Sequence, residues 1–185
     1  MESIPGVLSA LGGARALDAL RKLVEHPKPS VAREAIEALP QSREHKKVVL
    51  SRFDACAKSG DDLLLLAAVE HLTPSLDDDA VVEAFARHWD FGIRTTNTLM
   101  ASNAIFDALI SEAPKHALAR ATFEAAARHR HEYGQVRGLA ALALTGVDTR
   151  ENRKKLVALQ LKDLSSRSLR NSAIQLLNAA RAKKE

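Results

Sequence analysis

The sequence predicts an all-α protein built from repeated pairs of helices. Of its 185 residues, 58 are alanine or leucine, the two apolar residues that favour helices most strongly. Strands favour aromatic and β-branched side chains, and aromatic residues make up only 4% of the chain. This composition therefore argues against a protein rich in strands. The third observation is a pattern of apolar and small residues that recurs at about the length of one helix pair.

Five helices are expected in the first half of the chain, each ended by a short break. Residues 14–26 place Leu17 and Leu20 on one face and end at a turn with two prolines. The next helix begins at residue 30 and stops at Pro40. The remaining three cover residues 43–58, 61–72 and 77–89. The short segment 4–13 is expected to act as a partial cap of the first pair.

Five more helices are expected in the second half, with connections of only a few residues. They cover residues 92–113, 115–131, 133–147, 151–164 and 168–184. Because no linker is long enough to separate domains, we expect residues 1–185 to form a single domain.

The recurring pattern is clearest in the helices at Val136 and Leu169. An arginine follows each of these residues, an alanine comes four positions on, and apolar residues come seven and eight positions on. Weaker copies start at Val31, Leu64 and Ile93, so that successive starts are 33, 29, 43 and 33 residues apart. The pattern predicts five helix pairs, at approximately residues 13–40, 43–73, 76–113, 115–147 and 148–182.

This pattern resembles the second helix of HEAT repeats, which typically has valine and arginine followed by alanines and leucine at the same offsets. Each pair is too small to bury its apolar face alone, so neighbouring pairs have to stack. The resemblance implies a right-handed α-solenoid of about five antiparallel helix pairs, with the second helices lining its concave surface.

Arg94, Arg137 and Arg170 occupy the same position in three copies, and two roles are open for them. They resemble the ladder arginine of HEAT repeats, which is structural. They could also form a row of cations that binds phosphates or carboxylates. The stretch from Arg94 to Asn103 is unusually polar for a helix, because it contains Thr95, Thr96 and Asn97. The candidate binding residues on the concave face are therefore Arg94, Thr95, Asn97, Arg137, Arg170 and Asn171.

We expect no enzyme activity, no cofactor and no metal site. The chain has no glycine-rich phosphate loop, nucleophile elbow or His-Glu-x-x-His motif. His129 and His131 are two positions apart on a helix, so they would face different sides. Structural roles are expected at three further positions: a capping role for the run 77–79, core packing or a repeat junction for Trp89, and a buried thiol for Cys56. One Trp-Asp pair is too little to indicate a glycosylase of the DNA-alkylation-repeat class.

Charge is distributed unevenly along the chain, and this distribution affects which kind of partner it would bind. Residues 1–92 carry a net charge of −4, and residues 93–185 carry +8. The leading hypothesis is a non-catalytic scaffold or adaptor that binds a protein partner, such as an acidic segment, through its concave surface. Nucleic-acid binding through the arginines and lysines 154, 155 and 162 is the rival. A third alternative is a helical accessory domain of a larger enzyme such as a zinc aminopeptidase.

Localisation is expected to be cytoplasmic, with no membrane association. The N-terminus has no basic start ahead of its apolar stretch, as a secretory signal would. The longest apolar run, residues 63–69, is far shorter than a membrane span.

Overall fold

The structure, a computed structural model, describes residues 3–59, 62–90, 96–129, 132–145 and 154. These residues contain nine α-helices, one short 3-10 helix and no strand, so the predicted all-α class is confirmed. The elements are α1 (Ile4–Leu11), α2 (Gly13–Val24), α3 (Pro29–Ala38), α4 (Arg43–Ser59), α5 (Asp62–Leu72), η1 (Thr73–Ser75), α6 (Asp79–His88), α7 (Thr96–Glu112), α8 (Ala117–Ala127) and α9 (Glu132–Leu144). Of the predicted fifth pair, 148–182, only Lys154 belongs to the described residues.

Prolines, glycines and one aspartate set the ends of several helices. Pro29 occupies the first position of α3, where its missing N–H removes no helical hydrogen bond. Gly12 ends α1 with a φ of 63°, and Gly13 follows with a φ of 78°, a conformation that suits glycine. Asp78 caps α6, because its side chain accepts a hydrogen bond of 2.9 Å from the backbone N–H of Ala80. The predicted capping role of the run 77–79 is therefore confirmed at Asp78.

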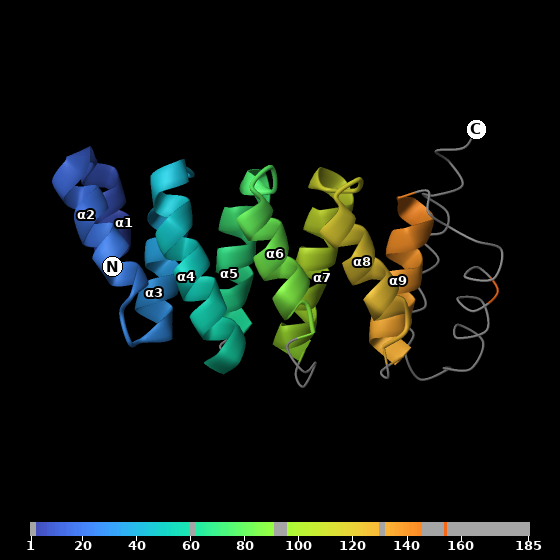
Figure 1. Cartoon of the computed structure of the whole chain (residues 1–185). Coiled ribbons are helices and arrows are strands. Elements are labelled where there is room, and N and C mark those ends of the chain that lie inside the picture. The colour runs from blue at the N-terminus through green and yellow to red at the C-terminus, as the bar shows by residue number, and fades with distance from the viewer. Residues whose placement is uncertain (1–2, 60–61, 91–95, 130–131, 146–153, 155–185) are drawn as a thin grey trace. The chain divides into compact units, whose positions relative to one another are not determined.

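The chain folds as two compact units, Met1–Ala108 and Leu109–Glu185. In the first unit the helices form two layers. One layer contains α1, α3 and α5, in which α3 contacts both of its neighbours, and the other contains α2, α4 and α6, in which α4 does the same. Contacts of α2 with α3 and of α4 with α5 join the layers, and Figure 1 shows α2, α4 and α6 in front. This arrangement buries one face of α3 and one face of α4, the middle helices of the two layers.

Aromatic rings fill the core between these layers. Phe53 of α4 and Phe85 of α6 lie 5.5 Å apart between ring centroids, and neither is exposed to solvent. Trp89 is 8% exposed and packs edge-to-face on Phe106 of α7, again with 5.5 Å between the centroids. Both the predicted core role of Trp89 and the predicted burial of Cys56, which is 3% exposed, are confirmed.

In the second unit, α9 approaches α8 so closely that only glycine fits at position 138. A Cβ atom on Gly138 would lie 2.5 Å from the carbonyl oxygen of Phe123 and 2.6 Å from the carbonyl carbon of Ala126. Real Cβ atoms essentially never come this close to backbone atoms. The packing of α9 on α8 therefore depends on the absence of a side chain at this position.

Candidate functional site

Most of the candidate binding residues from the sequence lie where the structure gives no side-chain description. Arg94, Thr95, Arg170 and Asn171 are outside the described residues, and Asn97 falls in the first turn of α7, where only the helix itself is described. Whether these residues share a surface stays a prediction.

Arg137 is the one candidate residue whose side chain is described. It lies in α9 and is 9% exposed, so it presents little surface to a partner. Burial of a guanidinium group is costly unless it is well bonded, and buried arginines usually hold structure together. The burial of Arg137 therefore favours the structural role over the binding role.

Three helices share one pattern of buried and exposed positions within the first unit. Counting from residue 30 in α3, 63 in α5 and 100 in α7, the first and eighth positions are exposed, and the third, sixth and seventh are buried, in all three helices. The sequence pattern paired Ile93 with Leu64, but the burial pattern pairs Leu64 with Ala101. The repeated pattern therefore starts eight residues, about two turns, later in α7 than the sequence pattern indicated.

This register places a carboxylate at the same position of the pattern in α3, α5 and α7. The eighth position is exposed in each helix and carries an acidic residue in all three: Glu37, Glu70 and Asp107. We call these three residues the carboxylate row. Because α3 packs on α5 within one layer, Glu37 and Glu70 follow one another across neighbouring helices.

Apolar side chains lie beside the carboxylate row. Leu63 is 51% exposed and Met100 is 48% exposed, and the two occupy the same position in α5 and α7. Leu66, which is half-buried, lies one turn further along α5. We call Leu63, Leu66 and Met100 the apolar row. Exposed large apolar side chains that gather on one face are typical of interaction surfaces.

The sign of the charge on this face is strongly biased. Among the described side chains of α3, α5 and residues 100–108 there are four carboxylates, those of Glu34 and the carboxylate row, and one cation, Arg33. Arg33 already forms an ion pair with Glu37 at 3.5 Å. The described side chains of this face therefore carry a net negative charge.

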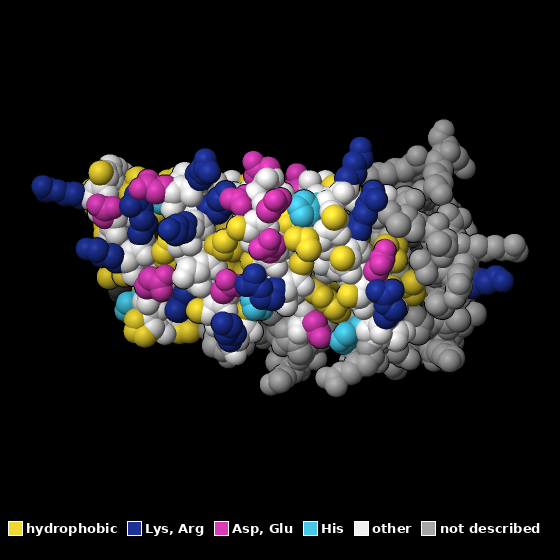
Figure 2. Space-filling view, viewed as in Figure 1, with side chains coloured by type: hydrophobic (Ala, Val, Ile, Leu, Met, Phe, Trp, Pro, Cys, Tyr) yellow, Lys and Arg dark blue, Asp and Glu magenta, His cyan; other side chains and the backbone are white. Residues whose placement is uncertain are grey.

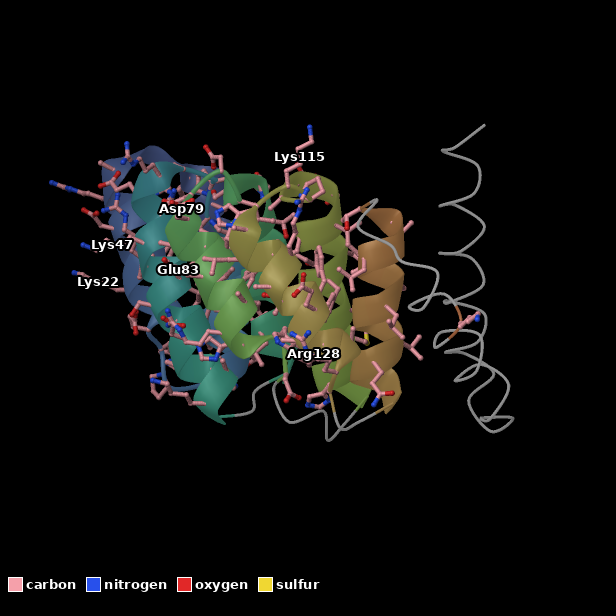
Figure 3. The ribbon with its side chains drawn as sticks, turned by 45° about the vertical axis from the view of Figure 1, so that its right-hand side comes forward. Lys22, Lys47, Asp79, Glu83, Lys115 and Arg128 are labelled. Atoms are coloured by element: carbon pink, nitrogen blue, oxygen red, sulfur yellow. The ribbon has the colours of Figure 1, made fainter. Side chains whose placement is uncertain are left out.

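The opposite layer differs, because there the two signs are mixed. Figure 2 shows lysines and arginines interspersed with acidic residues over α2, α4 and α6. Figure 3 shows two exposed lysines of this layer, Lys22 and Lys47, and two exposed acidic residues of α6, Asp79 and Glu83. Arg21 of α2 bridges to Glu44 of α4 at 3.2 Å. The charges of this layer are partly paired between helices.

A groove of about 470 Å³ lies between α1 and α3, next to the first member of the carboxylate row. It is lined by Glu34 and Glu37, by two serines and by small residues: Ser3, Gly6, Ser9, Ala10 and Ala38. The Ser9 hydroxyl donates a hydrogen bond of 3.2 Å to the Ala38 carbonyl, which ties the two helices together. Two carboxylates above a lining of small side chains suit a lysine or arginine side chain.

A second depression, of about 750 Å³, lies at the N-terminal ends of α4 and α6, and its charged groups have structural tasks. Lys46 donates a hydrogen bond of 2.5 Å to the carboxylate of Asp78. This bond, together with the bond from the Ala80 N–H, lowers the pKa of Asp78 below its ordinary value. Ser42 accepts a hydrogen bond from the backbone of His45 in the first turn of α4. These contacts are those expected of two helix starts joined by an ion pair.

An imidazole–carboxylate pair links α4 to α6. Nε2 of His88 lies 2.8 Å from Oδ1 of Asp54, and Arg87 approaches the same oxygen at 3.5 Å. The His88 ring also packs edge-to-face on Phe53, with 5.7 Å between the centroids. Since the ring is held on two sides by α4, this pair fixes the position of α6.

Within the described part of the chain, no group of three or more His, Cys, Asp or Glu residues is placed to hold a metal ion. The same residues contain no helix that is both long and apolar enough to cross a membrane. No protein-family model, curated protein or solved structure matches the chain, so its function has to be inferred from the site itself.

Sequence reasoning missed the carboxylate row, although part of the signal was present. Glu37 and Glu70 are 33 residues apart, which is also the spacing of the first two pattern starts, Val31 and Leu64. Asp107 breaks that spacing, because it comes 37 residues after Glu70, at the same position of the burial pattern. The first two members could therefore have been found from the sequence, and the third could not.

Proposed function

We propose that the chain is a non-catalytic HEAT-like repeat protein, a right-handed α-solenoid, that binds another protein. The binding surface is the outer face of the layer that contains α3 and α5, extended onto α7. The single observation that carries this proposal is the register shared by the three helices, which aligns the carboxylate row beside the apolar row. Surfaces built from equivalent positions of stacked repeats are the ones that repeat proteins use for binding.

The alternative of nucleic-acid binding gains nothing from this face. An excess of carboxylates repels phosphates, and the binding of DNA or RNA depends mainly on cations that neutralise phosphates. Lysines 155 and 162, proposed for that role, lie outside the described residues. A protein partner is therefore the better proposal for the first unit.

Peptide panning tests the proposed surface without knowledge of the natural partner. Random peptides displayed on phage would be selected on the immobilised full chain, and the selected peptides would be titrated by fluorescence anisotropy. The double substitution Leu63→Ser with Met100→Ser should weaken their binding by about tenfold or more, as loss of central apolar contacts does. Both side chains are about half exposed, so their loss should leave the fold intact.

Leu118→Ser is the matched control, because Leu118 of α8 is 38% exposed and lies outside the proposed surface. Its effect on binding should stay within about twofold, or about 0.4 kcal/mol. If both variants bind the selected peptides as tightly as the unchanged chain, the proposed surface is wrong.

A further inference from the structure

We propose that the partner of this face is a basic amphipathic helix that lies across α3, α5 and α7. Its lysine or arginine side chains contact the carboxylate row, and its apolar side chains contact the apolar row. This inference rests on the proposed function and names the chemistry of the partner. The acidic segment expected from the sequence suits the basic residues 93–185 rather than this face.

Charge complementarity is the first argument. The described side chains of this face include four carboxylates and only Arg33 as a cation, and that cation is engaged with Glu37. A basic segment would be attracted to such a surface, whereas an acidic segment would be repelled. The groove between α1 and α3 adds a place for one long cationic side chain between Glu34 and Glu37.

Spacing is the second argument. Packed helices lie about 8–10 Å apart, so equivalent residues on α3 and α5 repeat at about that distance. Residues seven apart on an α-helix lie on nearly the same side and are about 10.5 Å apart along its axis. A partner helix with a cation at every seventh position therefore matches the carboxylate row.

The distance between the two rows matches the width of one α-helix. Leu66 precedes Glu70 by four residues, and Leu63 precedes it by seven, so the apolar row lies about 6–10 Å from the carboxylate row along the helix axis. An α-helix with its side chains is about 10–12 Å wide. A single amphipathic helix can thus cover both rows at once, with its apolar face on one and its basic edge on the other.

Two synthetic peptides test the chemistry of the partner. The first consists only of leucine and lysine in an amphipathic pattern, and the second has glutamate in place of every lysine. Each would be about 14 residues long, enough to span three packed helices. Fluorescence anisotropy would measure their binding to the full chain. The lysine peptide should bind and the glutamate peptide should not.

Variants then tie the binding to the carboxylate row. The double substitution Glu37→Gln with Glu70→Gln should weaken binding of the lysine peptide by about fivefold, because two exposed charge pairs are lost. Glu25→Gln with Glu83→Gln is the matched control: it removes the same charge from an exposed residue at the end of α2 and from one in α6, and should change binding by less than about twofold. Equal weakening by both double variants, or equal binding of both peptides, would overturn the proposal.

The outcomes separate this inference from the proposed function. If the glutamate peptide binds, the lysine peptide does not, and Leu63→Ser with Met100→Ser abolishes that binding, the face is a binding surface but its partner is not basic. A second copy of the chain is another basic candidate, because residues 93–185 carry +8. Self-association in sedimentation velocity that Glu37→Gln with Glu70→Gln abolishes would identify that copy as the occupant and overturn a separate partner.

Discussion

At the scale of single residues, the first unit buries two histidines. His45 is 3% exposed and His71 is 8% exposed, and Nε2 of each has no hydrogen-bond partner among the described residues. Burial lowers the pKa of His71, and the nearby His45 lowers it further. A hydrogen bond to the Ile36 carbonyl opposes this effect only in part. The fold therefore favours the neutral imidazole at position 71.

We predict that acid destabilises the chain through His71. Because the pKa of His71 is lower in the folded than in the unfolded chain, the unfolded chain binds the extra proton first, below a pH of about 6.5. The free energy of unfolding should then fall by up to about 1.4 kcal/mol per pH unit for this group. His71→Leu should reduce that slope in urea denaturation between pH about 7.5 and 5.5. The same slope in the variant and the unchanged chain would contradict the assignment.

The cap of α6 gives a second prediction at this scale. Asp78→Ala removes both the hydrogen bond from Ala80 and the ion pair with Lys46, and should lower the free energy of unfolding by about 1 kcal/mol. Because the pKa of Asp78 is lowered by Lys46, its contribution is present above a pH of about 3.9 and is lost as the pH falls through the folded value. Urea denaturation at pH 7 measures the loss.

Asp77→Ala is the control for this prediction, because Asp77 is exposed and lies next to the capping residue. It removes the same charge and should cost well under 1 kcal/mol. A loss equal to that of Asp78→Ala would show that net charge, rather than the cap, accounts for the effect.

At the scale of helices, the close approach of α9 to α8 gives the strongest prediction on stability. Gly138→Ala should destabilise the second unit by about 1–3 kcal/mol or more, because the new Cβ meets backbone atoms that cannot rotate away. Thermal unfolding followed by circular dichroism measures the effect.

Gly6→Ala is the matched control for Gly138→Ala. Gly6 lies in α1, and its new Cβ would meet only the Ser3 hydroxyl, at 3.3 Å. Alanine favours helices over glycine by about 1 kcal/mol, so this substitution should be neutral or mildly stabilising. If both substitutions had the same effect, helix propensity rather than packing would control position 138.

Helix positions were predictable from the sequence to the extent that local chemistry sets them. Pro29, Pro40 and the run 77–79 mark helix ends by their own conformational or capping preferences, and the structure places helix ends at or beside each of them. The register of α7 was not predictable, since it depends on how α7 packs against its neighbours rather than on its own residues. The requirement for glycine at 138 was also hidden, because it depends on the distance between two helices.

At the scale of the whole molecule, the candidate site arises from repetition rather than from any single residue. Glu37, Glu70 and Asp107 are ordinary exposed carboxylates when each is considered alone. The proposed binding surface depends on all three helices carrying an acidic residue at the same position of the shared burial pattern. Arg94 and Arg170 also share one position of the repeated sequence pattern, but they lie outside the described residues.

Electrostatic attraction predicts that binding at this face depends on salt. The carboxylate row is exposed, and charges at a surface are screened more strongly as the Debye length falls from about 10 Å at 0.1 M to about 3 Å at 1 M. Affinity of the leucine–lysine peptide should therefore fall steadily with sodium chloride. The residual affinity at high salt should be removed by Leu63→Ser with Met100→Ser. Affinity that does not change with salt would contradict a role for the carboxylates.

Photo-crosslinking would locate a bound peptide on the surface of the protein. A leucine–lysine peptide with one photoreactive leucine analogue would be irradiated on the full chain, and mass spectrometry would locate the adducts. We expect adducts within residues 63–70 and 100–107, with fewer of them in the Glu37→Gln with Glu70→Gln variant. Adducts concentrated on α2 and α4, or spread evenly over both layers, would contradict this expectation.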